Sequence, residues 1–194
     1  MRPEALFPLV LSLTLAGPAA AAPLGIGRPA SHETIAAWDI DVRPDGQGLP
    51  PGHGSVRDGA ALFAARCAGC HGARGEGAAA EPLAGGRGSL ASAKPLRTVG
   101  SFWPYATTLF DYVRRAMPFD APQSLSPDET YAVSAYVLHL NGLLPEEASL
   151  DAASLPRVAM PNRDGFTADP RPDIAPPNPS ARPSARPAAH TETR

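Results

Sequence analysis

The amino-acid sequence predicts an all-α domain that is preceded by an extended N-terminal arm and followed by a proline-rich C-terminal tail. Three observations lead to this prediction. Residues 56–150 carry three patterns of helical periodicity, residues 22–55 are dense in glycine and proline, and residues 151–194 contain nine of the 24 prolines. The 194 residues carry 17 basic and 19 acidic side chains, so the net charge of −2 does not indicate a nucleic-acid-binding protein.

The first 21 residues are typical of an export signal. Arg2 is followed by a short apolar run over residues 6–16, and the small residues Ala19 and Ala21 provide a cleavage site after Ala21. The apolar run is shorter than the about 20 residues that a membrane-spanning helix requires. We therefore expect residues 1–21 to be removed as a signal peptide and the mature protein to be periplasmic.

The arm, residues 22–55, consists mostly of turns. One short helix is predicted to begin at Ser31, which is a suitable N-cap. After it, Trp38, Ile40 and Val42 alternate with acidic residues, which indicates an extended segment lying against an apolar surface. At the other end of the chain, the tail is expected to be disordered beyond about residue 170, because few apolar side chains remain there to offset the entropy of ordering.

The domain predicted over residues 56–150 contains three helices. The first and third each begin after a serine that can cap the helix, the second spans residues 106–115 and ends before a proline, and the third ends at a glycine. These start and stop signals are Ser55, Pro118, Ser126 and Gly142. Between the first two helices, residues 72–100 show little periodicity. Such a long loop and so thin a core are expected only where something other than side chains fills the interior.

Both cysteines of the chain lie in one pentapeptide, Cys67-Ala68-Gly69-Cys70-His71. This C-x-x-C-H pattern is typical of covalent haem attachment, because two thiols three positions apart at a helix end can each add to one vinyl group of the same porphyrin. The adjacent imidazole of His71 then projects toward the iron. A structural disulfide would not need the histidine, a thioredoxin-like pair would need a βαβ context, and a zinc site would need further ligands. We therefore expect one covalent haem c with His71 as an axial ligand of the iron.

The second axial ligand is expected to be a methionine. Met117 precedes Pro118 between the second and third helices, where the chain must pass the opposite face of the ring. Met160 also precedes a proline but lies in the tail, and His139 lies on the last helix, where a histidine is more often solvated than bound to a metal. Ligation by histidine and methionine leaves no open position at the iron and suits one-electron transfer.

Several residues are candidates for the pocket around the haem. We expect the backbone carbonyl of Pro82 to accept a hydrogen bond from the His71 ring, and Leu83 and Phe119 to lie against the porphyrin. Candidate hydrogen-bond donors to the haem propionates are Trp103, Tyr105, Arg87 and Arg97. Each of these has an alternative interpretation as a packed aromatic residue or a solvated charge.

Longer stretches than the haem motif resemble one particular family. They include residues 36–46 (AAWDIDVRPDG), 67–72, 82–86, 107–112, 114–125 (RRAMPFDAPQSL) and 160–165. On these residues the chain resembles class I cytochrome c and, more narrowly, the SoxD-type cytochrome subunit of the sulfur-oxidation (Sox) sulfite/sulfane dehydrogenase. The resemblance extends over residues 24–167.

The resemblance implies a class I cytochrome c fold, a haem held by Cys67 and Cys70, axial ligands His71 and Met117, and a separate molybdenum-cofactor subunit that oxidises the sulfur compound. The chain would accept electrons from that subunit one at a time and pass them to a downstream cytochrome. Some members of the family have a second haem domain, whereas this chain has a single C-x-x-C-H motif. We therefore expect an electron-transfer subunit that contains no catalytic residue of its own.

Two other functions remain as alternatives. A free-standing electron carrier to a terminal oxidase would need only residues 56–150, whereas in a complex the arm and residues 151–167 would serve as docking strips. A haem-based gas sensor or a peroxidase-like enzyme would need an open or displaceable sixth position at the iron. A sulfur-to-iron charge-transfer band in the oxidised protein, lost in Met117→Ala, would exclude the sensor and the peroxidase.

Overall fold

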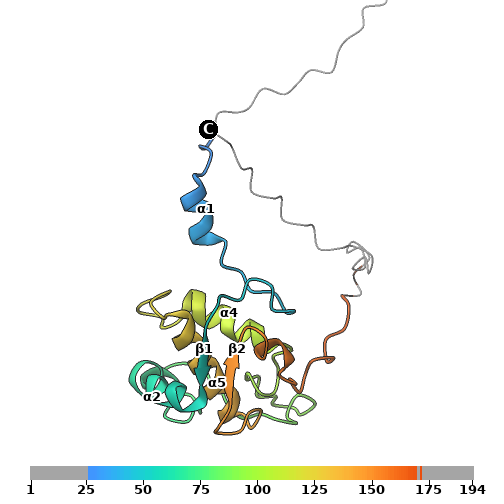
Figure 1. Ribbon diagram of the computed structural model, residues 1–194. Helices are drawn as coiled ribbons and strands as arrows, with labels where there is room; N and C mark the ends of the chain where they lie inside the picture. Colours follow the sequence, from blue (N-terminus) through green and yellow to red (C-terminus); the bar gives the residue numbers. More distant parts are fainter. Residues whose placement is uncertain (1–25, 170, 172–194) are drawn as a thin grey trace, which may run out of the picture. The chain divides into compact units, whose positions relative to one another are not determined.

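The computed structural model describes residues 26–169 and 171 (Figure 1). The predicted signal peptide, residues 1–21, lies outside the described residues, and so does the end of the tail after residue 171. The chain divides after Ala37 into two units, and each is described by itself.

Helix α1 (His32–Trp38) belongs, except for its last residue, to the first unit. It begins as predicted at Ser31, whose hydroxyl oxygen accepts a hydrogen bond from the Thr34 N–H at 3.1 Å. None of its residues is buried, and the apolar side chains of Ile35 and Trp38 are 52% and 78% exposed. The helix therefore gains little stability from burying its own apolar side chains.

The second unit is mostly helical, which confirms the predicted fold class. Its helices are α2 (Val56–Arg66), the single turn α3 (Ala68–His71), α4 (Ala106–Ala116) and α5 (Pro127–Leu140). The Ser55 side chain caps α2, and Ser126 forms a capping box with Glu129 at the start of α5, as the sequence indicated. Among the helices of the described residues, none has the length and apolar character needed to cross a membrane.

Two short strands that the sequence analysis did not predict join the segments before α2 and after α5. Strand β1 (His53–Ser55) pairs antiparallel with β2 (Ser149–Asp151), and the two lie side by side in Figure 1. The chain then forms the short 3-10 helix η1 (Leu155–Arg157). Each strand has three residues, too few for an alternating pattern to be recognised in the sequence.

Residues 151–160, which the sequence analysis assigned to the tail, pack into the core of the second unit. Leu155, Val158 and Met160 are buried in the same apolar cluster as the helices. The Asn162 side chain also donates a hydrogen bond to a backbone carbonyl of the loop before α4, at 2.7 Å. Because these apolar residues are few and unevenly spaced among prolines, composition alone did not reveal that they are buried.

Helix α5 lies at the centre of this unit and contacts α2, α4 and both strands. Tyr131 packs on Phe110 of α4, with ring centroids 4.5 Å apart, and Tyr136 packs on Phe63 of α2 at 5.3 Å. Helices α2 and α5 lie close together at Gly59, where a Cβ atom would be 1.9 Å from a carbonyl oxygen of α5. A side chain at this position would force the helices apart.

Residues 40–50 cover one side of the same core. Val42 and Leu49 are half-buried against it. The Tyr131 hydroxyl donates a hydrogen bond to the Pro50 carbonyl at 2.9 Å, which fixes the end of this segment to α5. The apolar surface predicted to lie under this segment is the core of the protein itself, and Val42 packs on it. The prediction is wrong for Trp38, which ends helix α1 and is 78% exposed.

Residues 72–100 contain no helix or strand, as predicted, but they form an ordered loop. The N–H groups of Leu83 and Ala84 both donate to the Gly75 carbonyl, at 2.8 and 3.0 Å, and the Val99 N–H donates to the Leu83 carbonyl at 3.3 Å. Backbone hydrogen bonds of this kind do not require a particular side chain at each position. They therefore leave no periodic pattern in the sequence.

Candidate functional site

The two cysteines lie where α2 and α3 meet. Cys67 ends α2 and begins α3, and Cys70 and His71 lie in the single turn of α3. The N–H groups of Cys70 and His71 both donate to the Cys67 carbonyl oxygen, at 3.1 and 3.0 Å. Residues three and four positions apart on a helical turn face the same side. The backbone of this turn therefore directs the two thiols and the imidazole to one side of the chain.

The two thiols have different surroundings. Cys67 is half-buried against the core, Cys70 is exposed, and neither is part of a disulfide. Burial raises the pKa of the Cys67 thiol above its ordinary value, and the neighbouring Arg66 guanidinium opposes that effect. Covalent haem attachment needs two free sulfurs on one turn with an imidazole beside them. The residues present therefore fit a c-type haem.

His71 is oriented by the loop that follows it. Its Nδ1 lies 3.1 Å from the Glu81 carbonyl oxygen. Because a carbonyl only accepts hydrogen bonds, Nδ1 carries the ring proton and donates it, which leaves Nε2 with a lone pair for a metal. The Pro82 carbonyl was predicted in this role, and that prediction is wrong by one residue.

The register of this loop is set by two backbone hydrogen bonds to the motif. The Gly77 N–H donates to the His71 carbonyl and the Ala80 N–H donates to the Cys70 carbonyl, each at 2.8 Å. The second bond brings the next carbonyl, that of Glu81, within reach of the imidazole. This register follows from the turns of the glycine-rich loop, and the position of Pro82 in the sequence does not reveal it.

A glycine and a carboxylate begin the loop. Gly72 ends α3 with a φ of +80°, and a Cβ atom on it would lie 2.6 Å from the Glu76 carboxylate. That carboxylate accepts a hydrogen bond from the Arg74 N–H at 2.7 Å. Hydrogen bonds from its own N–H and from that of Arg74 lower the pKa of Glu76. The tight turn after His71 thus depends on a residue without a side chain.

Asn141, at the end of α5, fastens the same loop from the other side, and sequence reasoning missed it. Its side-chain amide donates to the Leu83 carbonyl at 3.1 Å and to the Val137 carbonyl at 2.8 Å. Its side-chain oxygen accepts a hydrogen bond from the Gly85 N–H at 3.2 Å. In the sequence, an asparagine before Gly142 indicates only the end of a helix, so no local signal distinguishes this role.

Met117 follows the last residue of α4. Its N–H donates to the Val113 carbonyl at 3.0 Å, after which the backbone becomes extended and continues through a cis peptide bond to Pro118. The side chain is half-buried against the core. A thioether in this position is neither exposed like a surface side chain nor enclosed like a core methionine.

The structure separates the other pocket candidates into two groups. Pro82 is half-buried, and Leu83 and Trp103 are half-buried against the same core cluster as Cys67 and Met117. The Trp103 ring also packs edge-on against Tyr112 of α4, with centroids 6.1 Å apart.

The remaining candidates have other surroundings. Phe119 is 86% exposed. Arg97 lies over the Phe102 ring at 5.5 Å, and the guanidinium of Arg163 lies over the Tyr105 ring at 4.6 Å. For Arg97 and Tyr105, the interpretation as packed residues is therefore the one that these contacts favour.

The two alternatives to Met117 are engaged elsewhere. Met160 is 4% exposed and belongs to the core cluster. His139 is half-buried, with its Nδ1 3.0 Å from the Leu144 carbonyl and its ring stacked on Tyr136. Among the described residues, no group of three or more His, Cys, Asp or Glu side chains is arranged to hold a metal ion.

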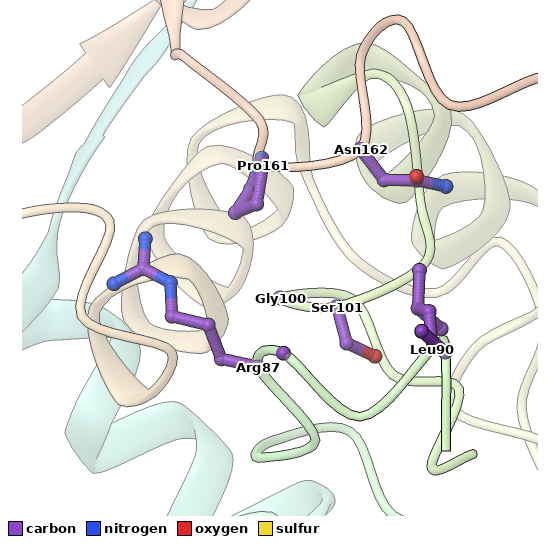
Figure 2. Close-up of a pocket in the computed structure, with 8 residues that line it drawn as sticks. Arg87, Leu90, Gly100, Ser101, Pro161 and Asn162 are labelled. Carbon is purple, nitrogen blue, oxygen red and sulfur yellow. The ribbon is translucent and has the colours of Figure 1, made fainter. Parts of the chain in front are cut away.

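A hollow of about 270 Å³ lies between the loop after Pro82 and the C-terminal segment (Figure 2). Its lining includes Arg87, Leu90, Gly100, Ser101, Pro161 and Asn162. The Ser101 hydroxyl donates to the Leu96 carbonyl at 2.6 Å, and the Asn162 amide donates to the Phe102 carbonyl at 2.7 Å. Both polar groups donate to backbone carbonyls of the protein and so stabilise its fold. We therefore interpret the hollow as a gap between two packed segments.

Comparisons with known proteins agree with this geometry. The cytochrome c family model matches residues 56–141. A chain in the crystal structure of the sulfane dehydrogenase SoxCD from Paracoccus pantotrophus is 50% identical, and the match covers 77% of this chain and 74% of that one with a TM-score of 0.71. A chain of the thiosulfate dehydrogenase TsdBA from Marichromatium purpuratum is 30% identical over 43% of this chain and 17% of that one. Its TM-score of 0.33 is too low to support a conclusion. No curated protein matches the chain.

Proposed function

Because this chain belongs to the SoxD-type cytochromes c, we propose that it is a periplasmic monohaem cytochrome that accepts electrons from a molybdenum-containing sulfite/sulfane dehydrogenase subunit and passes them to a downstream cytochrome. The observation that carries the proposal is the 50% identity to a chain of the SoxCD complex over 77% of this chain. The chain is an electron carrier, and the partner subunit would oxidise the sulfur compound.

Four residues of the chain hold the haem in this proposal. The thiols of Cys67 and Cys70 would form the thioether bonds, and His71, through Nε2, and Met117 would bind the iron. When bound, the haem supplies one-electron chemistry, as its iron changes between the ferric and ferrous states. With Met117 as a ligand the iron would have no open position, so the arrangement favours electron transfer over gas sensing or peroxidase activity.

A single haem fixes how many transfers each turnover requires. The chain contains one C-x-x-C-H motif, so we propose one haem. Oxidation of sulfite to sulfate consumes one water and releases two protons and two electrons at the partner. A carrier with one haem therefore leaves the partner in an intermediate oxidation state after the first transfer. It must pass on its electron before it can accept the second.

Helix α1 is the segment that we assign to docking on the partner. Within residues 151–167, the other predicted docking strip, Leu155, Val158 and Met160 are buried in the core of the protein itself. None of the residues of α1 is buried, and its apolar residues Ile35 and Trp38 are exposed. Exposed aromatic and aliphatic side chains of this kind are typical anchors of protein interfaces.

The test is to express the holoprotein together with the molybdoprotein from the same organism and to measure their association and the reduction of the haem by sulfite. We expect sulfite to reduce the haem only when the molybdoprotein is present. A haem that ascorbate reduces, but that sulfite and the molybdoprotein together do not, would contradict the proposal.

The docking role of α1 is tested by the double substitution Ile35→Ser and Trp38→Ser. Removing two apolar anchors is expected to weaken the complex by at least about tenfold, with the absorption spectrum unchanged. Ile26→Ser, which changes another exposed apolar side chain, is the matched control and should bind like the wild type. Equal binding by the double variant would show that the partner docks elsewhere.

A further inference from the structure

Helix α4, which leads into the proposed ligand Met117, presents two faces with different partners. Its buried apolar residues recur at helical spacing and pack on the core; they are Ala106, Leu109, Phe110 and Val113. A second row follows i, i+4, i+7 and i+8 spacing and carries polar groups; it consists of Thr107, Asp111, Arg114 and Arg115. The last turn of the helix therefore has one buried apolar residue, Val113, and two arginines that project elsewhere.

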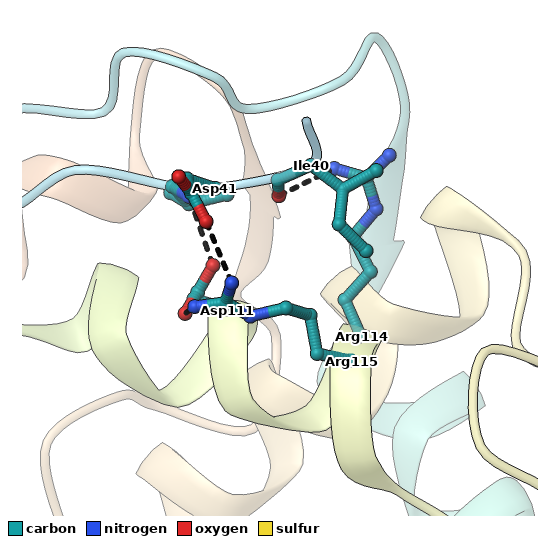
Figure 3. Close-up of polar contacts among 6 residues, drawn as sticks. Ile40, Asp41, Asp111, Arg114 and Arg115 are labelled. Atoms are coloured by element: carbon teal, nitrogen blue, oxygen red, sulfur yellow. Dashed lines mark hydrogen bonds and ion pairs between the residues drawn. The ribbon is translucent and has the colours of Figure 1, made fainter. Parts of the chain in front are cut away.

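Residues 40–44, here called the strap, supply the partners of the polar row (Figure 3). Four hydrogen bonds join the strap to α4 along the length of the helix. They run from the Thr107 hydroxyl to the Pro44 carbonyl at 3.3 Å, from the Val42 N–H to Asp111 Oδ1 at 2.8 Å, from the Arg114 guanidinium to the Ile40 carbonyl at 3.4 Å, and from the Arg115 guanidinium to Asp41 at 2.6 Å.

Asp111 is the centre of this arrangement. One of its carboxylate oxygens accepts the strap N–H, and the other accepts a hydrogen bond from Arg115 at 2.5 Å. The Asp111 side chain is 14% exposed, compared with 43% for Arg115 and 68% for Asp41. A charged acceptor protected from water binds its donors more strongly than an exposed ion pair does. The contact between Asp111 and the strap backbone is therefore the principal tether.

We propose that the strap is a positioning element for the sixth haem ligand, because it holds the last turn of α4 in place through Asp111 and thereby holds Met117. The proposal rests on the assignment of Met117 as an axial ligand in the proposed function. It extends that function by giving a role to the strap, whose Val42 lies 69 positions before Asp111 in the chain. Asp111 and Arg115 are positioning residues in this sense.

The position of Met117 in the chain explains why such a tether matters. Its N–H still donates to Val113, but its own backbone is extended, with φ −120° and ψ 149°. The direction of the side chain is therefore set by where the last turn of α4 ends. If the strap is released, that turn keeps its apolar contact at Val113 and loses its outer restraint. Met117 would then leave the iron more often while the rest of the fold persists.

The experiment compares Asp111→Ala with the wild type as oxidised holoproteins, and uses imidazole as a competing ligand. Imidazole binds the iron only in the fraction of molecules from which Met117 has departed, so its apparent affinity reports that fraction. We expect the affinity of Asp111→Ala for imidazole to rise about tenfold, which corresponds to about 1.4 kcal/mol. In urea, the sulfur-to-iron charge-transfer band of the variant should disappear before its helical circular dichroism signal.

Two further variants control for general destabilisation. Asp111→Asn keeps an oxygen that can accept the Val42 N–H but loses the ion pair with Arg115, so we expect an imidazole affinity between those of the wild type and Asp111→Ala. Arg57→Ala removes a different exposed ion pair, with Glu146 in the segment between α5 and β2, and should bind imidazole like the wild type.

The outcomes separate this proposal from the proposed function. Unchanged imidazole affinity in Asp111→Ala, or equal increases in Asp111→Ala and Arg57→Ala, would overturn the role of the strap. An oxidised wild-type protein without the charge-transfer band would contradict the assignment of Met117, and the strap proposal with it. If the band is present and imidazole binds as expected, failure of sulfite to reduce the haem would contradict only the proposed partner.

Discussion

The two sides of the proposed haem site are held by contacts that span very different separations in the sequence. On the His71 side, ten positions separate the histidine from the carbonyl that orients its ring, and hydrogen bonds within the intervening loop close that gap. On the Met117 side, the principal tether of α4 joins residues 69 positions apart, Val42 and Asp111. The first side is therefore set mainly by one continuous stretch of chain, and the second depends on tertiary packing.

This difference indicates which side should open first. Local hydrogen bonds persist as long as the stretch that contains them is folded, whereas long-range tethers are lost when either segment moves. We therefore expect attachment of the haem to depend on the His71 side. Occupancy of the sixth position is expected to depend on the Met117 side.

The largest effect is expected for His71→Ala. The substitution removes the nitrogen that would bind the iron next to the two thioether bonds, so covalent haem per polypeptide should fall by at least about tenfold. Haem staining after denaturing electrophoresis measures this quantity. His139→Ala is the control and should keep a wild-type haem content. Full haem content in His71→Ala would show that attachment does not depend on this side of the site.

Met117→Ala should leave haem attachment intact and change only the iron. The oxidised variant is expected to lose the sulfur-to-iron charge-transfer band, and its reduction potential should fall because a thioether ligand raises the potential. Absorption spectroscopy and a redox titration measure both. Met160→Leu, which keeps an apolar side chain in the core, is the matched control. If the band survives in Met117→Ala and disappears in Met160→Leu, the iron ligand is Met160 and not Met117.

The same division explains what the sequence could predict. The helix starts at Ser55 and Ser126 and the C-x-x-C-H turn are local signals, because a cap or a haem motif involves residues within a few positions of one another. The class of fold and the candidate ligands followed from them. The resemblance to SoxD-type cytochromes, confirmed by the match to SoxCD, added the family.

The features that sequence reasoning missed depend on distance in space. Strands β1 and β2 have three residues each, and the burial of Leu155 and Met160 depends on helices far away in the chain. The carbonyl that accepts from His71 belongs to Glu81 because of the register of a glycine-rich loop. The i, i+4 spacing of Asp111 and Arg115 was visible in the sequence, but the strap that meets them was not.

Asn141→Ala tests whether the His71 side is held mainly by contacts between residues that are close in the sequence. The asparagine joins α5 to the loop 58 positions earlier, so its loss should lower the free energy of unfolding by about 1–3 kcal/mol, as expected for hydrogen-bond partners left unpaired. Urea unfolding of the holoprotein measures this. Asn162→Ala, which removes the hydrogen bond to the Phe102 carbonyl, is the comparison variant and should not alter the reduction potential. If Asn141→Ala does alter it, the His71 side also relies on a distant contact.

The smallest effect concerns the pH dependence of stability at Tyr131, whose hydroxyl holds the end of the arm segment at Pro50. Burial, with a smaller contribution from the Asp151 charge, raises the pKa of Tyr131 from 10.0 to about 12. Between these two values the unfolded chain releases the proton and the folded protein keeps it. The free energy of unfolding should therefore be unaffected by this group below the lower value and should decrease as pH rises through the window.

Tyr131→Phe removes that pH dependence together with the hydrogen bond to Pro50. We expect it to cost about 1 kcal/mol near neutral pH and to flatten the decline at alkaline pH. Urea unfolding followed by circular dichroism at about pH 9 and about pH 11 measures the slope. Tyr112→Phe, at an exposed position on α4, should keep the wild-type slope. Because Pro50 follows the strap in the same segment, ionisation of Tyr131 should weaken the Met117 side while the contacts of the His71 side persist. Equal slopes in the wild type and Tyr131→Phe would remove this link between the arm and α5.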